Sequence, residues 1–149
     1  DMLIHGTCVD LDGAGVLFRG PSGSGKSDLA LRLIDGYDAR LVADDQVELT
    51  CRGDDLIASP PSALAGMLEV RGFGLVRQPH LESAAVVMVI DLCPRDAIKR
   101  LPNTQNTTIE GKALPCLCLC PQDASACAKV RLALDHVRNG KQLLDTAHG

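Results

Sequence analysis

The sequence lacks the features that mark several large classes of protein. It has no cluster of basic residues, and its net charge is −4 with an isoelectric point near 5.5. Binding to nucleic acid or to an anionic membrane surface needs basic side chains that neutralise phosphates, so we expect neither partner. No apolar run approaches the roughly 18 residues that cross a bilayer, and the longest, around Ala84–Ile90, has the length of a strand.

Secretion signals are also lacking. The chain begins at Asp1 with neither the basic nor the apolar region of a signal peptide. Its seven cysteines are an odd number, and 149 residues of 46% hydrophobic composition can form a core without disulfides. We therefore predict a soluble, cytoplasmic protein with reduced thiols. A zinc site at Cys116, Cys118, Cys120 and Cys127 is an alternative, but C-x-C-x-C spacing lacks the usual C-x2-C knuckle and favours buried thiols instead.

The hydrophobic pattern predicts one α/β domain over residues 1–149, with a mixed, mostly central β-sheet flanked by helices. A helix is predicted from Lys26 to Ile34, stopped by Gly36, and a second from Ala124 to Arg138. Pro102–Thr108 is predicted to be a polar loop. The expected strands are Leu3–Val9, Gly15–Arg19, Arg40–Ala43, Val47–Cys51, Leu56–Ser59, Met67–Val70, Ala84–Leu92 and Lys112–Cys120, the last with Pro115 at an edge or bulge.

A phosphate-binding motif follows the second predicted strand. The segment GPSGSGKS matches G-x4-G-K-[ST], in which glycines let backbone N–H groups converge on an anion. The lysine reaches the terminal phosphates and the last hydroxyl can bind Mg²⁺. A strand before the loop and a helix after it are the context that this motif requires. The predicted phosphate-binding residues are Gly20, Pro21, Ser22, Gly23, Ser24, Gly25, Lys26 and Ser27.

Phosphoryl transfer also needs a metal ligand beyond the loop and a carboxylate near the acceptor. Asp91, at the end of the longest apolar run, would be the ordinary acid of such a site. Asp44 and Asp45 end a shorter run, and Glu69 precedes an Arg-Gly-Phe-Gly turn. Spacing alone does not rank these acids. Neighbouring acids at a strand end point to different sides, so one could hold Mg²⁺ while the other meets the acceptor.

Four motifs together resemble the catalytic domain of the HPr kinase/phosphorylase family. They are His5–Gly6, the loop Gly20–Ser27, Ala43–Asp45, and the Glu-Val-Arg-Gly-Phe-Gly segment Glu69–Gly74. The resemblance is consistent from about Leu3 to Leu75. It implies a cytoplasmic kinase that uses ATP and Mg²⁺ to phosphorylate a serine of HPr, the phosphocarrier of the sugar phosphotransferase system.

The resemblance also implies roles for individual residues. Asp44 would take the serine proton, and Lys26 would stabilise charge on the transferred group. Ser27 and Glu69 would bind Mg²⁺ with help from Asp45. His5, Arg71 and Arg100 would belong to the catalytic set. Without the resemblance, His5 is more often a structural histidine, and a tight turn with a solvent-facing Arg71 remains an alternative for the Arg-Gly-Phe-Gly segment.

The family also implies a homo-oligomer, a hexamer in form, and dephosphorylation by inorganic phosphate. No arginine lies between Leu114 and Val130, where an anionic nucleophile would need a cationic partner, which argues against the second reaction. The N-terminal domain of longer members is absent from this sequence, so we expect a short-form member or a catalytic domain.

Other functions remain open from the residues alone. The chain has no N-K-x-D motif for guanine, which disfavours a GTPase. A small-metabolite kinase would normally have a lid with several arginines. Here only the segment from Arg95 to Arg100 could form such a lid, and it has two. A nucleotide-sensing regulator that binds without transferring phosphate could retain both Asp44 and the loop.

Overall fold

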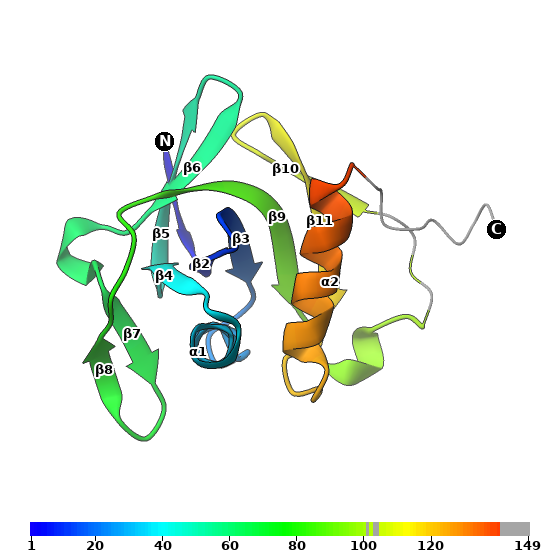
Figure 1. The fold of residues 1–149 in the computed structure, drawn as a ribbon, viewed down its shortest axis with the longest axis horizontal. Helices are drawn as coiled ribbons and strands as arrows, with labels where there is room; N and C mark the ends of the chain where they lie inside the picture. The colour runs from blue at the N-terminus through cyan, green and yellow to red at the C-terminus, as the bar shows by residue number, and fades with distance from the viewer. Residues whose placement is uncertain (101, 103–104, 141–149) are drawn as a thin grey trace.

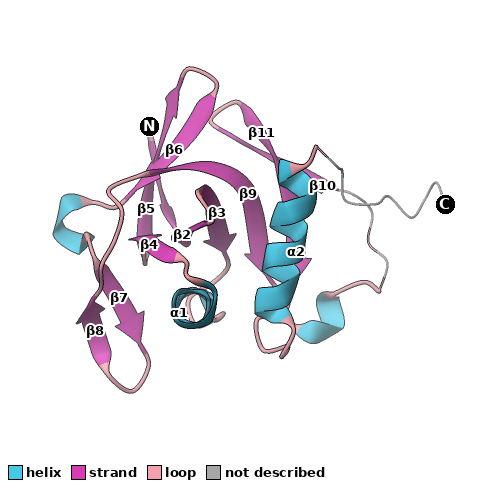
Figure 2. Cartoon of the chain, in the orientation of Figure 1, coloured by secondary structure: helices cyan, strands magenta, loops and turns pink. Residues whose placement is uncertain are grey.

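The computed structural model describes residues 1–100, 102 and 105–140 (Figures 1 and 2). The elements in chain order are β1 (Met2–His5), β2 (Thr7–Leu11), β3 (Ala14–Arg19), α1 (Lys26–Tyr37), β4 (Arg40–Ala43), β5 (Gln46–Arg52), β6 (Asp55–Ser59), η1 (Ser62–Leu64), β7 (Met67–Val70), β8 (Gly74–Arg77), β9 (Ala84–Leu92), η2 (Arg95–Ala97), β10 (Gln105–Ile109), β11 (Lys112–Leu119) and α2 (Ala126–Arg138).

A curled, mixed sheet forms the body of the molecule, in the order β1-β5-β6-β9-β3-β2-β4. The long strand β9 is its centre. It pairs in parallel with β3 and β11, and its first residues pair antiparallel with β6. β10 extends the sheet beyond β11, while β7 and β8 form a separate hairpin to one side of α1 (Figure 1). The predicted α/β class with a mixed sheet is therefore confirmed.

The central strands are buried on both faces. On β3, Val16 and Phe18 belong to the cluster packed by α1 and α2, whereas Leu17 belongs to a second cluster built from strands. On β9, Met88 belongs to the cluster packed by the helices and Val89 to the cluster built from strands. A strand buried on both faces reads as a continuous apolar run, which explains the pattern of Val86–Ile90. Both helices pack on the first cluster, so they cover one face rather than both.

Several expectations about the elements were wrong. The run Leu3–Val9 is divided at Gly6, because β1 pairs with β5 while β2 pairs with β3 and β4. The first helix continues through Gly36 and ends with Asp38 in the left-handed conformation. Within the predicted loop Pro102–Thr108, residues from Gln105 onward form β10, whose backbone hydrogen bonds to β11 offset its weak apolar pattern; Asn103 and Thr104 lie outside the described residues.

The last strand also differs from expectation at Pro115. β11 lies between β9 and β10 instead of at an edge. Pro115 is opposite Asn106 of β10, and the pairing with β9 begins only at Cys116. The proline thus precedes the part of the strand that needs hydrogen bonds on both sides. Among the described helices, none is long and apolar enough to cross a membrane.

Two glycines test this packing in opposite directions. A Cβ added at Gly15, where β3 runs against β9, would lie 2.6 Å from the carbonyl oxygen of Ala85. We expect Gly15→Ala to lower the free energy of unfolding by about 1–3 kcal/mol, because the backbone of β9 must move. At Gly36, inside α1, an added Cβ meets nothing within 4 Å. Gly36→Ala should stabilise the protein by up to about 1 kcal/mol. Urea denaturation measures both, and equal effects of the two substitutions would contradict this account.

Candidate functional site

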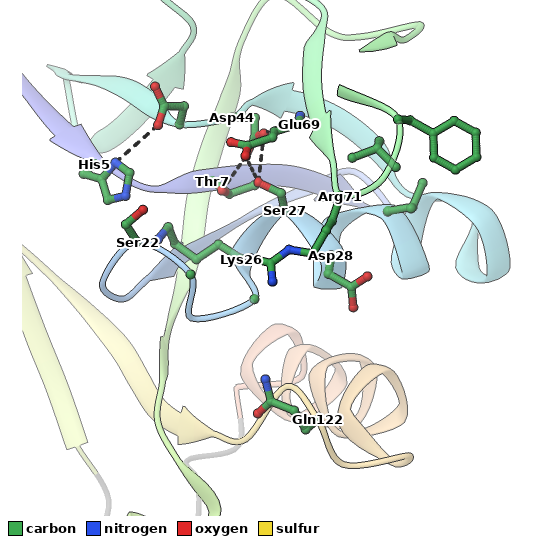
Figure 3. A pocket seen from close by; sticks show the side chains of 16 residues that line it. His5, Thr7, Ser22, Lys26, Ser27, Asp28, Asp44, Glu69, Arg71 and Gln122 are labelled. Carbon is green, nitrogen blue, oxygen red and sulfur yellow. Dashed lines mark hydrogen bonds and ion pairs between the residues drawn. The ribbon is translucent and has the colours of Figure 1, made fainter. Parts of the chain in front are cut away.

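A cavity of about 580 Å³ lies at the junction of the loop before α1, the end of β4 and the β7–β8 hairpin (Figure 3). This volume is within the roughly 300–1,000 Å³ of small-molecule sites. It brings together residues from five separate parts of the sequence. The lining residues are His5, Thr7, Ser22, Gly23, Gly25, Lys26, Ser27, Asp28, Leu31, Asp44, Asp45, Glu69, Val70, Arg71, Phe73 and Gln122.

The loop Gly20–Gly25 connects β3 directly to α1, as the sequence predicts. Gly23 and Gly25 have positive φ angles of 81° and 102°, which residues with a Cβ rarely adopt. A Cβ on Gly25 would also lie 3.1 Å from Pro121. The loop is therefore built from residues that let the backbone turn tightly into the helix, and the N-terminus of a helix attracts anions. The buried hydroxyl of Ser24 has no hydrogen-bond partner among the described residues.

Lys26 is buried at the start of α1. Its Nζ donates hydrogen bonds to the carbonyl oxygens of Gly20 at 2.7 Å and Pro21 at 3.0 Å. Burial lowers the pKa of the Lys26 ammonium, an effect that the nearby carboxylates of Asp44 and Asp45 oppose. An anion in the cavity would, like these carboxylates, raise the pKa of the Lys26 ammonium. The fold thus holds a desolvated cation beside the loop.

Asp44 is the most highly connected side chain of the cavity, and it is only 3% exposed. Its Oδ1 accepts hydrogen bonds from the hydroxyls of Thr7 and Ser27, both at 2.7 Å. Its Oδ2 accepts from the same Ser27 hydroxyl at 2.9 Å and from the backbone N–H of Glu69 at 2.9 Å. A buried carboxylate is costly unless donors surround it, so these three donors fix the side chain in place.

Asp45 points away from Asp44, as neighbouring acids at the end of a strand are expected to do. Its side chain is exposed, and its Oδ1 lies 3.5 Å from Nδ1 of His5 (Figure 3). The φ of Asp45 is 70°, so the chain leaves β4 in a left-handed turn. Asp45 therefore faces His5 at the rim, whereas Asp44 faces Ser27.

Asp91, the alternative acid, does not line the cavity. Both of its carboxylate oxygens accept hydrogen bonds from Arg19, at 2.8 and 3.0 Å, across the parallel pair β3 and β9. The thiol of Cys116 donates to the same carboxylate at 3.3 Å. The structure thus pairs Asp91 with Arg19 and leaves Asp44 as the acid that contacts Ser27.

The cysteines form no zinc site in the described part of the chain, where no group of three or more His, Cys, Asp or Glu side chains could hold a metal ion. Cys116, Cys120 and Cys127 are buried and unbridged, as the sequence favours, while Cys118 is exposed. Burial, together with Asp91, raises the pKa of Cys116 to about 12. Such a thiol is a poor nucleophile at neutral pH.

The Arg-Gly-Phe-Gly segment forms the turn between β7 and β8. Phe73 N–H donates to the carbonyl of Val70 at 2.9 Å, and Gly72 has a φ of 90°, as a type II turn requires at its third residue. This turn directs Glu69 and Arg71 to the cavity, where both are exposed. Arg100 does not line the cavity; it follows η2, in the segment between β9 and β10.

Thr7 and Gln122 are among the cavity residues that sequence reasoning missed, as are Asp28 and Leu31. Thr7 is fully buried and bonded to Asp44, 37 residues away in the chain. A buried threonine in a strand gives no signal of such a contact by itself. Gln122 lies across the cavity from Lys26, in the turn before α2 (Figure 3). A lone glutamine after a predicted strand likewise carries no recognisable motif.

Comparison with known proteins identifies the family. The family model of the HPr serine kinase C-terminal domain matches residues 1–113. The chain belongs to this family. It is 47% identical over 88 residues to the HPr kinase/phosphorylase of Clostridium tetani (strain Massachusetts / E88), a match covering 58% of this chain and 28% of that protein. The chain therefore matches well under two thirds of the length of this relative.

A solved structure has the same fold. The HPr(Ser) kinase/phosphatase from Coxiella burnetii superposes with a TM-score of 0.83 at 24% sequence identity, over 94% of this chain and 98% of that one. The family suggested by the four motifs is confirmed, and the α/β fold with its curled mixed sheet is that of a known HPr(Ser) kinase/phosphatase structure.

The hydrogen bond from Thr7 to Asp44 can be tested by an isosteric change. Thr7→Val removes one donor from a buried carboxylate, so we expect a loss of about 1–3 kcal/mol in the free energy of unfolding. Thr7→Ser keeps the hydroxyl and should recover most of that loss. Urea denaturation at neutral pH measures both variants. If the Thr7→Val protein is as stable as the unaltered chain, the hydrogen bond from Thr7 to Asp44 contributes nothing to the free energy of unfolding.

Proposed function

We propose that this chain is an ATP-dependent protein serine kinase that phosphorylates the phosphocarrier HPr. The observation that carries the proposal is the contact of Asp44 with Ser27 at 2.7 Å, at the mouth of the loop. It sets a carboxylate beside the residues whose sequence matches a phosphate-binding loop. Membership of the HPr serine kinase family supplies the acceptor.

The chain's residues fit a nucleotide with Mg²⁺. The glycines of the loop and the start of α1 offer backbone N–H groups to the phosphates, and Lys26 offers its ammonium once it leaves the Gly20 and Pro21 carbonyls. Oxygen ligands suit Mg²⁺, and we assign Ser27 and Glu69 to it, with Asp45 as a further ligand that would have to turn from His5. When bound, Mg²⁺ would neutralise charge on the phosphate oxygens.

Asp44 acts on the acceptor in this proposal. Its carboxylate takes the proton of the serine hydroxyl as the serine oxygen bonds to the γ-phosphorus. The bond from that phosphorus to the bridging oxygen breaks, and ADP leaves with the electron pair. Asp44 must exchange the hydrogen bond from Ser27 for one from the acceptor, while Thr7 and the Glu69 N–H keep it oriented.

His5 and Arg71 have supporting roles in the proposal. Both line the cavity, and His5 lies at its rim against Asp45. Arg71 is the one arginine among the lining residues, and it is placed to contact a phosphate oxygen. Arg100 is exposed and lies outside the cavity lining. The role that we propose for it is therefore contact with the acceptor protein.

The arginine pattern favours a protein acceptor over a small metabolite. Arg95 is paired with Asp123 at 2.7 Å, and neither Arg95 nor Arg100 lines the cavity. The described residues thus supply no lid of arginines over the loop, which a small-metabolite kinase would normally have. We also propose a homo-oligomer, a hexamer by family resemblance. Dephosphorylation of HPr is not part of the proposal, since Leu114–Val130 contains no arginine.

The proposal predicts that the chain with Mg-ATP adds one phosphate to a serine of HPr. Asp44→Asn should keep ATP binding and lower the transfer rate by about 10²–10⁴-fold, because a general base is removed. Asp54→Asn, in the exposed β5–β6 turn, is the matched control and should transfer normally. Mass spectrometry of HPr measures transfer, and calorimetry measures ATP binding.

Each alternative has its own outcome in this assay. Normal transfer by Asp44→Asn would reject Asp44 as the base. Labelling of a metabolite pool in place of HPr would identify a small-molecule kinase. ATP binding with no transfer to either acceptor would identify a nucleotide-sensing regulator.

A further inference from the structure

The β7–β8 hairpin has an outer face that continues the cavity wall. In an antiparallel pair, residues opposite one another project from the same face of the hairpin. Glu69 is opposite Leu75, and Met67 is opposite Arg77. Glu69 lines the cavity, so the side chains of Leu75 and Arg77 lie on the same face, further along β8. Leu68, from the other face, is fully buried in the core beside α1.

This outer face carries unusually exposed apolar side chains. Phe73 is 84% exposed and Leu75 is 65% exposed, the two highest values among the large hydrophobic residues of the described chain. Phe73 stands between Gly72 and Gly74, whose φ angles of 90° and 101° fix the turn that presents it. Single exposed leucines are ordinary, but two highly exposed apolar residues two positions apart, the first of them in the cavity lining, mark a surface for another molecule.

The β7–β8 hairpin carries two arginines, Arg71 and Arg77, against one acid, Glu69, although the whole chain is acidic. Arg71 and Arg77 are exposed and form no ion pair with any described residue. The net charge of the chain is −4, so the hairpin is a local basic region on an acidic protein. An acidic surface on a partner would be attracted to it.

We propose that Phe73, Leu75 and Arg77, here called the docking strip, bind the acceptor protein. The partner is a protein with an apolar patch, bordered by acidic side chains, next to the hydroxyl that it presents to Asp44. The proposal rests on the kinase function proposed above. Its physical reason is continuity: Phe73 lines the cavity that contains Asp44, so an acceptor that reaches Asp44 passes over the strip. An apolar anchor with charges at its rim gives both affinity and orientation.

The test uses two variants outside the cavity lining. Leu75→Ser removes an apolar contact, and Arg77→Glu reverses a charge. We expect each to raise KM for HPr, Leu75→Ser by about tenfold, with kcat and the dissociation constant for ATP unchanged. The effect of Arg77→Glu should shrink as salt is added. Leu132→Ser, on the exposed side of α2, and Arg52→Glu, at the end of β5, are matched controls and should leave KM unchanged.

The outcomes separate the two proposals. Transfer to HPr with normal KM in both strip variants would overturn the docking strip alone. Failure of the unaltered chain to phosphorylate HPr would overturn the kinase proposal, and the docking strip with it. Sedimentation of each variant decides a third case. If the Leu75→Ser variant and the unaltered chain differ in oligomeric state, the strip binds a second copy and the docking proposal is wrong.

Discussion

The buried carboxylate of Asp44 is the constraint on which the site depends. A charge that is 3% exposed requires donors, and here they come from β2, from the start of α1 and from β7. The three donors are 37, 17 and 25 residues away in the chain. Satisfying Asp44 therefore draws the loop, the edge strand β4 and the hairpin together, and the same contacts that hold the fold also form the cavity.

The choice of acid follows from the neighbouring ion pair. Arg19 and Asp91 are direct partners in the parallel pair β3 and β9, and the guanidinium of Arg19 engages both oxygens of Asp91. A bidentate pair of this kind has strong geometric preference, so Asp91 is committed to Arg19. The acid at the end of the central strand is thus engaged by Arg19, and the acid that contacts Ser27 comes from β4, at an edge of the sheet.

Local patterns in the sequence predicted most of the fold. β4 and β9 were predicted with their observed bounds, because short apolar runs between turn residues define them. The loop between β3 and α1 follows from its glycines. β8 and β10 were missed, because Gly74–Arg77 and Gln105–Ile109 have little apolar alternation and are stabilised by backbone pairing with a neighbour. Pairing between segments is a property of the fold, so single-strand patterns do not reveal it.

The candidate site was predictable where motifs carry chemistry, as at Lys26 and Asp44, and unpredictable where a contact arises only from folding, as at Thr7. The surroundings of Lys26 indicate which kind of group the site can bind. Burial lowers the pKa of its ammonium, and two neutral carbonyls are its hydrogen-bond acceptors. An anionic phosphate oxygen adds charge–charge attraction to the hydrogen bond it accepts from an ammonium, so phosphate oxygens would displace the carbonyls of Gly20 and Pro21. Asp44 does not compete for this cation by hydrogen bonding, because its oxygens accept from Thr7, Ser27 and Glu69. The fold thus keeps Lys26 and Asp44 apart in their hydrogen bonding, as the proposed phosphoryl transfer requires.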